Sequence, residues 1–114
     1  MAPKTNPLKL NALQLKTLTV LQQLATVPMF SEANADTGEV LIRYFPRPHG
    51  DHFHCGDAIV MSRDATGLQN KAVWTALERK GLARSHYPDS IVLLPDALGY
   101  ETGLAERILL RADH

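Results

Sequence analysis

The sequence has little of several features that define common protein classes. It contains one cysteine among 114 residues, which excludes an internal disulfide framework and fits a reducing compartment. Twelve Lys and Arg residues balance twelve Asp and Glu residues, so the formal net charge is +0 with His neutral. This balance argues against binding that is driven by bulk charge alone. No secretory signal and no membrane-spanning apolar stretch is visible, and we therefore expect a cytoplasmic protein.

Signature motifs of several enzyme classes are also missing. There is no Gly-rich phosphate-binding loop, no paired CxxC and no dinucleotide-binding fingerprint. The residue types of a nucleophile, a base and an orienting acid occur together in Cys55, His54 and Asp57. However, neighbouring residues on a strand point to opposite faces, so these side chains would not converge on one site. We therefore expect no catalysis. The chain has 45% hydrophobic and 21% charged residues, a globular composition, and its length predicts a single domain over residues 1–114.

The first predicted helix covers residues 11–25, where apolar side chains recur on one broad stripe. Asn11 is the expected N-cap, with Gln14 three residues later to complete a capping box. Residues 31–38 are polar and predict a connection that contains a turn. Residues 39–45 and 52–61 then predict two strands of an extended, His- and Pro-rich hairpin at about 39–61. For residues 58–63, a strand and a short helix capped by Asp57 both remain open.

The second predicted helix covers residues 66–80. Thr66 is the expected N-cap, with Gln69 at N3. At the other end, Gly81 stands where a left-handed residue belongs and Leu82 can pack on Leu77, as in a Schellman motif. Two short strands over 82–86 and 90–94 predict a second hairpin, and residues 102–112 predict a terminal helix.

The order of these elements resembles a winged helix-turn-helix domain over roughly residues 10–99. The strongest similarity is the helix end Leu77-Glu78-Arg79-Lys80-Gly81-Leu82, which leads into the predicted hairpin, and the strand Ile91-Val92-Leu93-Leu94-Pro95 with Gly99 beyond it. The resemblance implies a winged-helix-like α+β fold in which helices pack with small antiparallel β-hairpins. The leading hypothesis is therefore a transcriptional regulator that binds double-stranded DNA. We expect it to form a homodimer through its terminal helices and to need no cofactor.

Residues 63–84 carry the charge pattern that DNA binding needs, with five basic residues against two acidic ones. Amide side chains on a recognition helix can pair with adenine edges, and Lys and Arg with guanine or phosphate. The competing interpretation of this charge pattern is an ordinary solvated helix face. Trp74 is expected either to be covered by the first hairpin or to be exposed at an interface. The candidate DNA-contacting residues are Arg63, Gln69, Asn70, Lys71, Trp74, Arg79, Arg84 and His86.

A second group of candidates lies in the stretch 49–57, which is rich in His. On a strand, His52 and His54 project to the same face, as metal ligands on sheets often do. His49 or Asp51 from the turn would complete a site for zinc or iron, and Cys55 would join it if the segment is a loop. A polar hairpin with surface histidines is the alternative. The runner-up function is therefore a protein-interaction or metal-sensing module on a winged-helix scaffold, with a protein partner in place of DNA.

Overall fold

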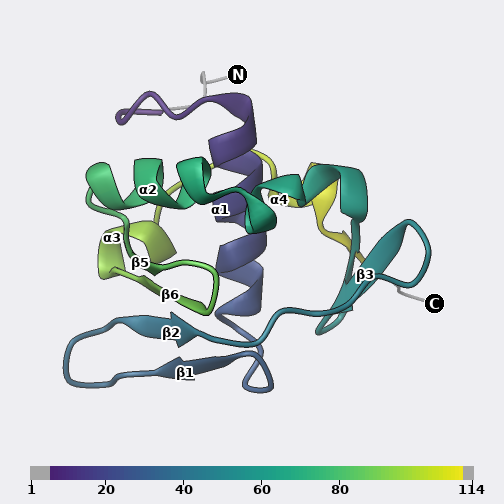
Figure 1. Cartoon of the computed structure of the whole chain (residues 1–114), viewed down its shortest axis with the longest axis horizontal. Coiled ribbons are helices and arrows are strands. Elements are labelled where there is room, and N and C mark those ends of the chain that lie inside the picture. Colours follow the sequence, from purple (N-terminus) through teal and green to yellow (C-terminus); the bar gives the residue numbers. More distant parts are fainter. Residues whose placement is uncertain (1–5, 112–114) are drawn as a thin grey trace.

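A long helix, three shorter helices and two antiparallel sheets make up residues 6–111, the part of the chain that the computed structural model describes (Figure 1). This arrangement confirms the predicted α+β class. No helix within these residues is long and apolar enough to cross a membrane. The elements in chain order are α1 (Ala12–Leu24), β1 (Ser31–Ala33), β2 (Val40–Ile42), β3 (His52–Cys55), β4 (Ala58–Met61), the 3₁₀ turns η1 (Ser62–Asp64) and η2 (Thr66–Gln69), α2 (Lys71–Arg79), β5 (Ala83–His86), β6 (Ser90–Leu93), α3 (Pro95–Leu98), α4 (Ala105–Ile108) and β7 (Leu110–Arg111).

Helix α1 begins as predicted and runs through the middle of the molecule (Figure 1). The side-chain oxygen of Asn11 accepts a hydrogen bond from the Gln14 backbone N–H at 2.8 Å, and the Gln14 side chain accepts from the Asn11 backbone N–H at 3.0 Å. This capping box satisfies two N–H groups that would otherwise lack partners at the helix start. The buried stripe includes Leu18, Leu21 and Leu24, which are completely inaccessible to solvent.

The first sheet has the strand order β1-β2-β6-β5 with antiparallel pairs throughout. The predicted hairpin over 39–61 is wrong, because β2 pairs with β1 on one side and with β6 on the other. Strand β1 lies in the segment that we expected to be a polar connection. Its turn is built around Asn34, whose side chain accepts from the N–H groups of Asp36 and Thr37, and Gly38 adopts a φ of +77°.

The second sheet has the order β3-β4-β7. Here residues 52–61 fold back on themselves through Gly56, with a φ of +65°. Of the two alternatives for residues 58–63, the strand is correct for residues 58–61, and residues 62–63 begin the turn η1. The predicted helix over 102–112 is wrong for most of its length. Only α4 is helical. Strand β7 pairs with the edge of β4 and supplies hydrogen-bond partners to backbone groups of β4 that a terminal helix would leave unpaired. Ala112 lies outside the described residues.

Helix α2 begins later than predicted. Residues Thr66–Gln69 form the turn η2, and the side chain of Asn70 caps α2 by accepting from the N–H groups of Ala72 and Val73 at 3.0 and 3.4 Å. The prediction of Thr66 as N-cap is wrong because residues 66–69 follow the surface of α1. There a Cβ at Gly67 would lie only 1.8 Å from the Oγ1 atom of Thr17.

The C-terminal end of α2 confirms the predicted Schellman motif. The Leu82 N–H donates to the Leu77 carbonyl and the Gly81 N–H to the Glu78 carbonyl, both at 3.0 Å. Gly81 has a φ of +79°, which a residue with a Cβ rarely adopts. This turn directs the chain into β5, so the predicted hairpin of β5 and β6 is also confirmed.

Candidate nucleic-acid interface

Helix α2 presents one stripe of exposed residues to solvent. Val73, Trp74 and Leu77 are buried on the other side of the helix. The exposed positions recur at spacings of one, three and four residues, as expected for a single face of a helix. They are Lys71, Ala72, Thr75, Glu78 and Arg79.

Trp74 is a core residue and not a DNA contact. Its side chain is 1% exposed and packs between Phe45, with ring centroids 5.8 Å apart, and Tyr87, at 4.8 Å in an edge-to-face arrangement. The indole Nε1–H donates to the Gly67 carbonyl at 3.2 Å. Of the two alternatives for Trp74, the covered one is correct. The cover comes from the segment after β2 and from the turn between β5 and β6.

Four cations near α2 have no carboxylate within 4 Å among residues 6–111. They are all exposed: Arg63, Lys71, Arg79 and Lys80. The acidic residues of the same stretch are engaged elsewhere. Asp64 pairs with Lys16 at 3.2 Å, and the Glu78 side chain accepts from the Ser85 N–H at 3.0 Å. The stretch 63–80 therefore shows solvent a positive surface, although the chain as a whole is neutral.

Arg84 is not free for phosphate as the structure stands. Its guanidinium donates to both carboxylate oxygens of Glu39, at 2.9 and 2.7 Å. These hydrogen bonds lower the pKa of Glu39 below its ordinary value, and the carboxylate in turn raises the pKa of Arg84. His86, two residues further along β5, is exposed. Arg84 can therefore bind a phosphate, as predicted, only after its ion pair with Glu39 breaks.

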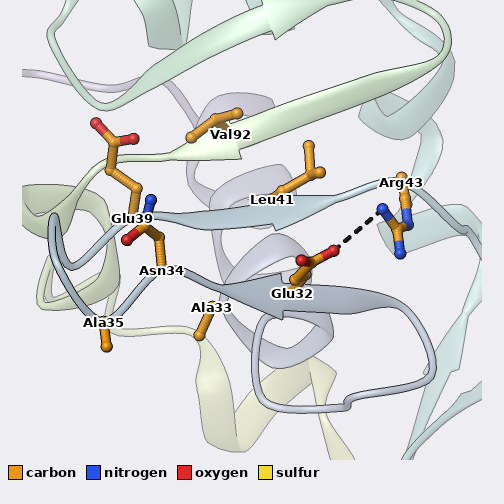
Figure 2. Close-up of a pocket in the computed structure, with 8 residues that line it drawn as sticks. All are labelled: Glu32, Ala33, Asn34, Ala35, Glu39, Leu41, Arg43 and Val92. Atoms are coloured by element: carbon orange, nitrogen blue, oxygen red, sulfur yellow. Dashed lines mark ion pairs between the residues drawn. The ribbon is translucent and has the colours of Figure 1, made fainter.

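The outer face of the first sheet is a separate surface. Glu32, Leu41, Val92 and Arg84 lie in one row across the four strands, by the register of the strand pairs. A hollow of about 590 Å³ lies on this face, and Figure 2 shows Leu41 and Val92 between Glu39 on one side and the ion pair of Glu32 with Arg43, at 3.1 Å, on the other. Because the arginines here are paired with carboxylates, this face offers little attraction for phosphate.

The side chains of Gln69 and Asn70 occupy different situations. Gln69 is exposed, and its backbone carbonyl accepts from the Tyr87 hydroxyl at 2.8 Å. The Asn70 side-chain oxygen is used in the cap of α2. The Gln69 side chain thus lies just before the exposed stripe without a hydrogen bond to the described part of the chain, whereas the Asn70 oxygen is not available to a base edge.

The structure separates the predicted metal ligands into two sets. The rings of His49, His52 and His54 cluster on one side of the β3 hairpin. Cys55 is completely buried on the other side, because β3 alternates between solvent and core. The prediction of Cys55 as a co-ligand of these histidines is therefore wrong. As the side chains are oriented, no group of three or more His, Cys, Asp and Glu residues within 6–111 could hold a metal ion.

Burial raises the pKa of the Cys55 thiol to about 12. We expect the folded protein to react with iodoacetamide at pH 8 roughly 1,000-fold more slowly than the protein unfolded in guanidinium chloride, because the reactive thiolate is depleted by about that factor. Mass spectrometry of timed, quenched samples measures the two rates. Equal rates in the folded and unfolded protein would contradict the burial of this thiol.

Several residues that shape the interface were missed by sequence reasoning. Glu39 lies 45 residues from Arg84, and Phe45 lies 29 residues from Trp74. No periodicity or cap signal links residues at such separations, because tertiary packing brings them together. Comparison of the chain with family models, curated proteins and solved structures gives no significant match in any of the three, so the functional proposals below rest on the geometry of this chain alone.

Proposed function

We propose that this protein binds double-stranded DNA through the exposed stripe of α2, on a winged-helix-like scaffold. The order of α1, β2, α2 and the β5–β6 hairpin supports the scaffold, together with the pairing of β2 with β6. Two features depart from the resemblance. The turns η1 and η2 replace the helix expected before the recognition helix, and β3 and β4 form an additional hairpin.

The observation that carries the proposal is the set of four exposed cations around α2 that have no carboxylate partner among residues 6–111. A surface of this kind binds phosphates by releasing condensed counterions from DNA, so its affinity depends strongly on salt. Lys71 begins α2, and Gln69 ends the turn η2 just before it. This is the end of the helix that approaches base edges in helix-turn-helix proteins. Arg63, Arg79 and Lys80 take the role of phosphate contacts. Trp74 and the Asn70 side-chain oxygen take no part.

The proposal does not depend on the homodimer that we expected from the terminal helices. Within the described residues, that segment forms only the single turn α4 and the short strand β7. One chain offers a single helix for a major groove. A dimer would place two such helices on adjacent half-sites.

We expect the variants Lys71→Glu and Arg79→Glu each to weaken binding to a mixed-sequence duplex by about tenfold, and the loss of each phosphate contact to reduce the salt slope by about one. Fluorescence anisotropy of a labelled duplex across a series of salt concentrations measures both quantities. Arg43→Glu is the matched control, because Arg43 is an exposed cation on the outer face of the first sheet, away from α2.

Two outcomes would contradict DNA binding through α2. The first is a duplex affinity that does not change with salt. The second is an equal loss of affinity in the Arg43→Glu control, which would mean that only the total charge of the protein matters. Absence of DNA binding would favour the alternative of a protein partner on the same scaffold.

A further inference from the structure

Three of the five histidines of the chain lie together on the β3 hairpin. The ring centroids are 6.3 Å apart for His49 and His52, 5.6 Å for His49 and His54, and 5.4 Å for His52 and His54. His49 and His54 are exposed, and the His52 side chain is 33% exposed. The cluster lies on the opposite side of β3 from the buried residues Phe53 and Cys55.

The backbone, and not only the side-chain torsions, brings these rings together. His52 and His54 project from the same face of β3 because they are two residues apart on a strand. His49 joins them through an isolated antiparallel bridge to His52, in which the His49 N–H donates to the His52 carbonyl at 2.6 Å. Gly50, with a φ of +70°, makes the tight turn between them.

The spacing of the rings is close to that of imidazoles around one metal ion. With metal–nitrogen bonds of about 2.1 Å and a tetrahedral angle, the centres of two ligating rings lie about 5 Å apart. Ring rotation is needed to bring one nitrogen of each histidine to a common point, because the present orientations do not form such a site. Exposed side chains change rotamers rapidly and at little cost, so the ion can select the converged arrangement.

One histidine of the cluster already has the partner that ligating histidines use. The Nδ1 atom of His52 lies 3.2 Å from the Oδ1 atom of Asp51. A carboxylate that accepts from one ring nitrogen fixes the tautomer and leaves the other nitrogen as a ligand. The Asp51 carbonyl also accepts from the Ser62 N–H at 2.8 Å, which ties this turn to the end of β4.

We propose that His49, His52 and His54 bind one divalent transition-metal ion of the zinc class. Three neutral imidazoles suit zinc, nickel or copper, and the exposure of the cluster leaves a further coordination position to water. Asp51 is a positioning residue that orients His52. Cys55 is not a ligand. This site is distinct from the α2 surface and stands independently of DNA binding.

Isothermal titration calorimetry of the untagged 114-residue chain with ZnCl₂ tests the site. We expect one Zn²⁺ per chain. His49→Asn, His52→Asn and His54→Asn should each lower the affinity at least about 100-fold, and Asp51→Asn about tenfold. The control His86→Asn removes an exposed histidine from β5 and should change the affinity less than twofold. Circular dichroism of each variant checks that the fold is retained.

Replacement of Zn²⁺ by Co²⁺ tests the identity of the ligands. We expect visible absorption bands from nitrogen and oxygen ligands without a thiolate-to-metal charge-transfer band, because Cys55 points into the core. A charge-transfer band would overturn the three-histidine site. Absence of Zn²⁺ binding, or equal weakening by His86→Asn, would also overturn it.

Discussion

The variant Trp74→Ala is expected to lose about 3–5 kcal/mol of unfolding free energy, the range measured for large aromatic side chains removed from cores. Trp74 is 1% exposed and contacts the rings of Phe45 and Tyr87. It therefore joins α2, the segment after β2 and the β5–β6 hairpin. For a domain whose total stability is of the order of 5–15 kcal/mol, this loss is a large part of the whole.

Denaturant unfolding of the wild type and three variants measures this effect. Trp74→Phe keeps an aromatic ring but loses the hydrogen bond from Nε1 to the Gly67 carbonyl, and we expect a smaller loss, of about 1–2 kcal/mol. Thr75→Ala, at the exposed neighbouring position, should change stability by less than about 0.5 kcal/mol. A loss below about 1 kcal/mol in Trp74→Ala would contradict the packing described for this ring.

The variant Gly67→Ala is expected to lose about 3 kcal/mol, the upper part of the range for overpacked cores. A Cβ at this position would lie 1.8 Å from the Oγ1 atom of Thr17, which is completely buried in α1. Thr17 cannot turn away freely, because its hydroxyl donates to the Leu13 carbonyl at 2.8 Å. The turn η2 would have to move away from α1, and it would carry the carbonyl that accepts from Trp74 with it.

Gly99→Ala is the matched control for Gly67→Ala. A Cβ at Gly99 would meet no atom within 4 Å, and its φ of −100° is one that alanine adopts readily. Thermal unfolding should therefore leave Gly99→Ala near the wild type while Gly67→Ala melts at a clearly lower temperature. Equal melting temperatures for the two variants would contradict the close contact between η2 and α1.

Local signals in the sequence predicted those parts of the fold that local interactions determine. The capping box of Asn11 and Gln14 fixes the start of α1, and Gly81 fixes the end of α2, since both depend on hydrogen bonds within one turn of helix. The β5–β6 hairpin was predictable for the same reason, because its two strands are separated only by the turn at residues 87–89.

The parts of the fold that were predicted wrongly depend on contacts between residues far apart in the sequence. Strand β1 has the sequence Ser-Glu-Ala, which carries no strand pattern, and it becomes a strand because β2 offers it a backbone ladder. Residues 110–111 pair with β4 instead of extending a helix. Phe45, which covers Trp74, lies 29 residues away in the sequence and Tyr87 lies 13 residues away, so no local pattern could indicate that the Trp74 ring is buried.

The candidate sites were predictable in part. Of the predicted DNA contacts, Arg63, Gln69, Lys71 and Arg79 are exposed, whereas Trp74 is buried. The pairing of Arg84 with Glu39 was not predictable, because the two residues meet across the sheet. Alternation along a strand predicted that His52 and His54 share a face, and it also explains why Cys55 faces the core.

Chemical-shift mapping with a short DNA duplex tests the central proposal most directly. With ¹⁵N-labelled protein at low salt, we expect the shifted amides to cluster around η1 and the exposed stripe of α2, and the shifts to fall as salt is raised. The outer-face residues Glu32 and Leu41 should remain unchanged. Shifts centred on that outer face, or no shifts at any salt concentration, would contradict DNA binding through α2.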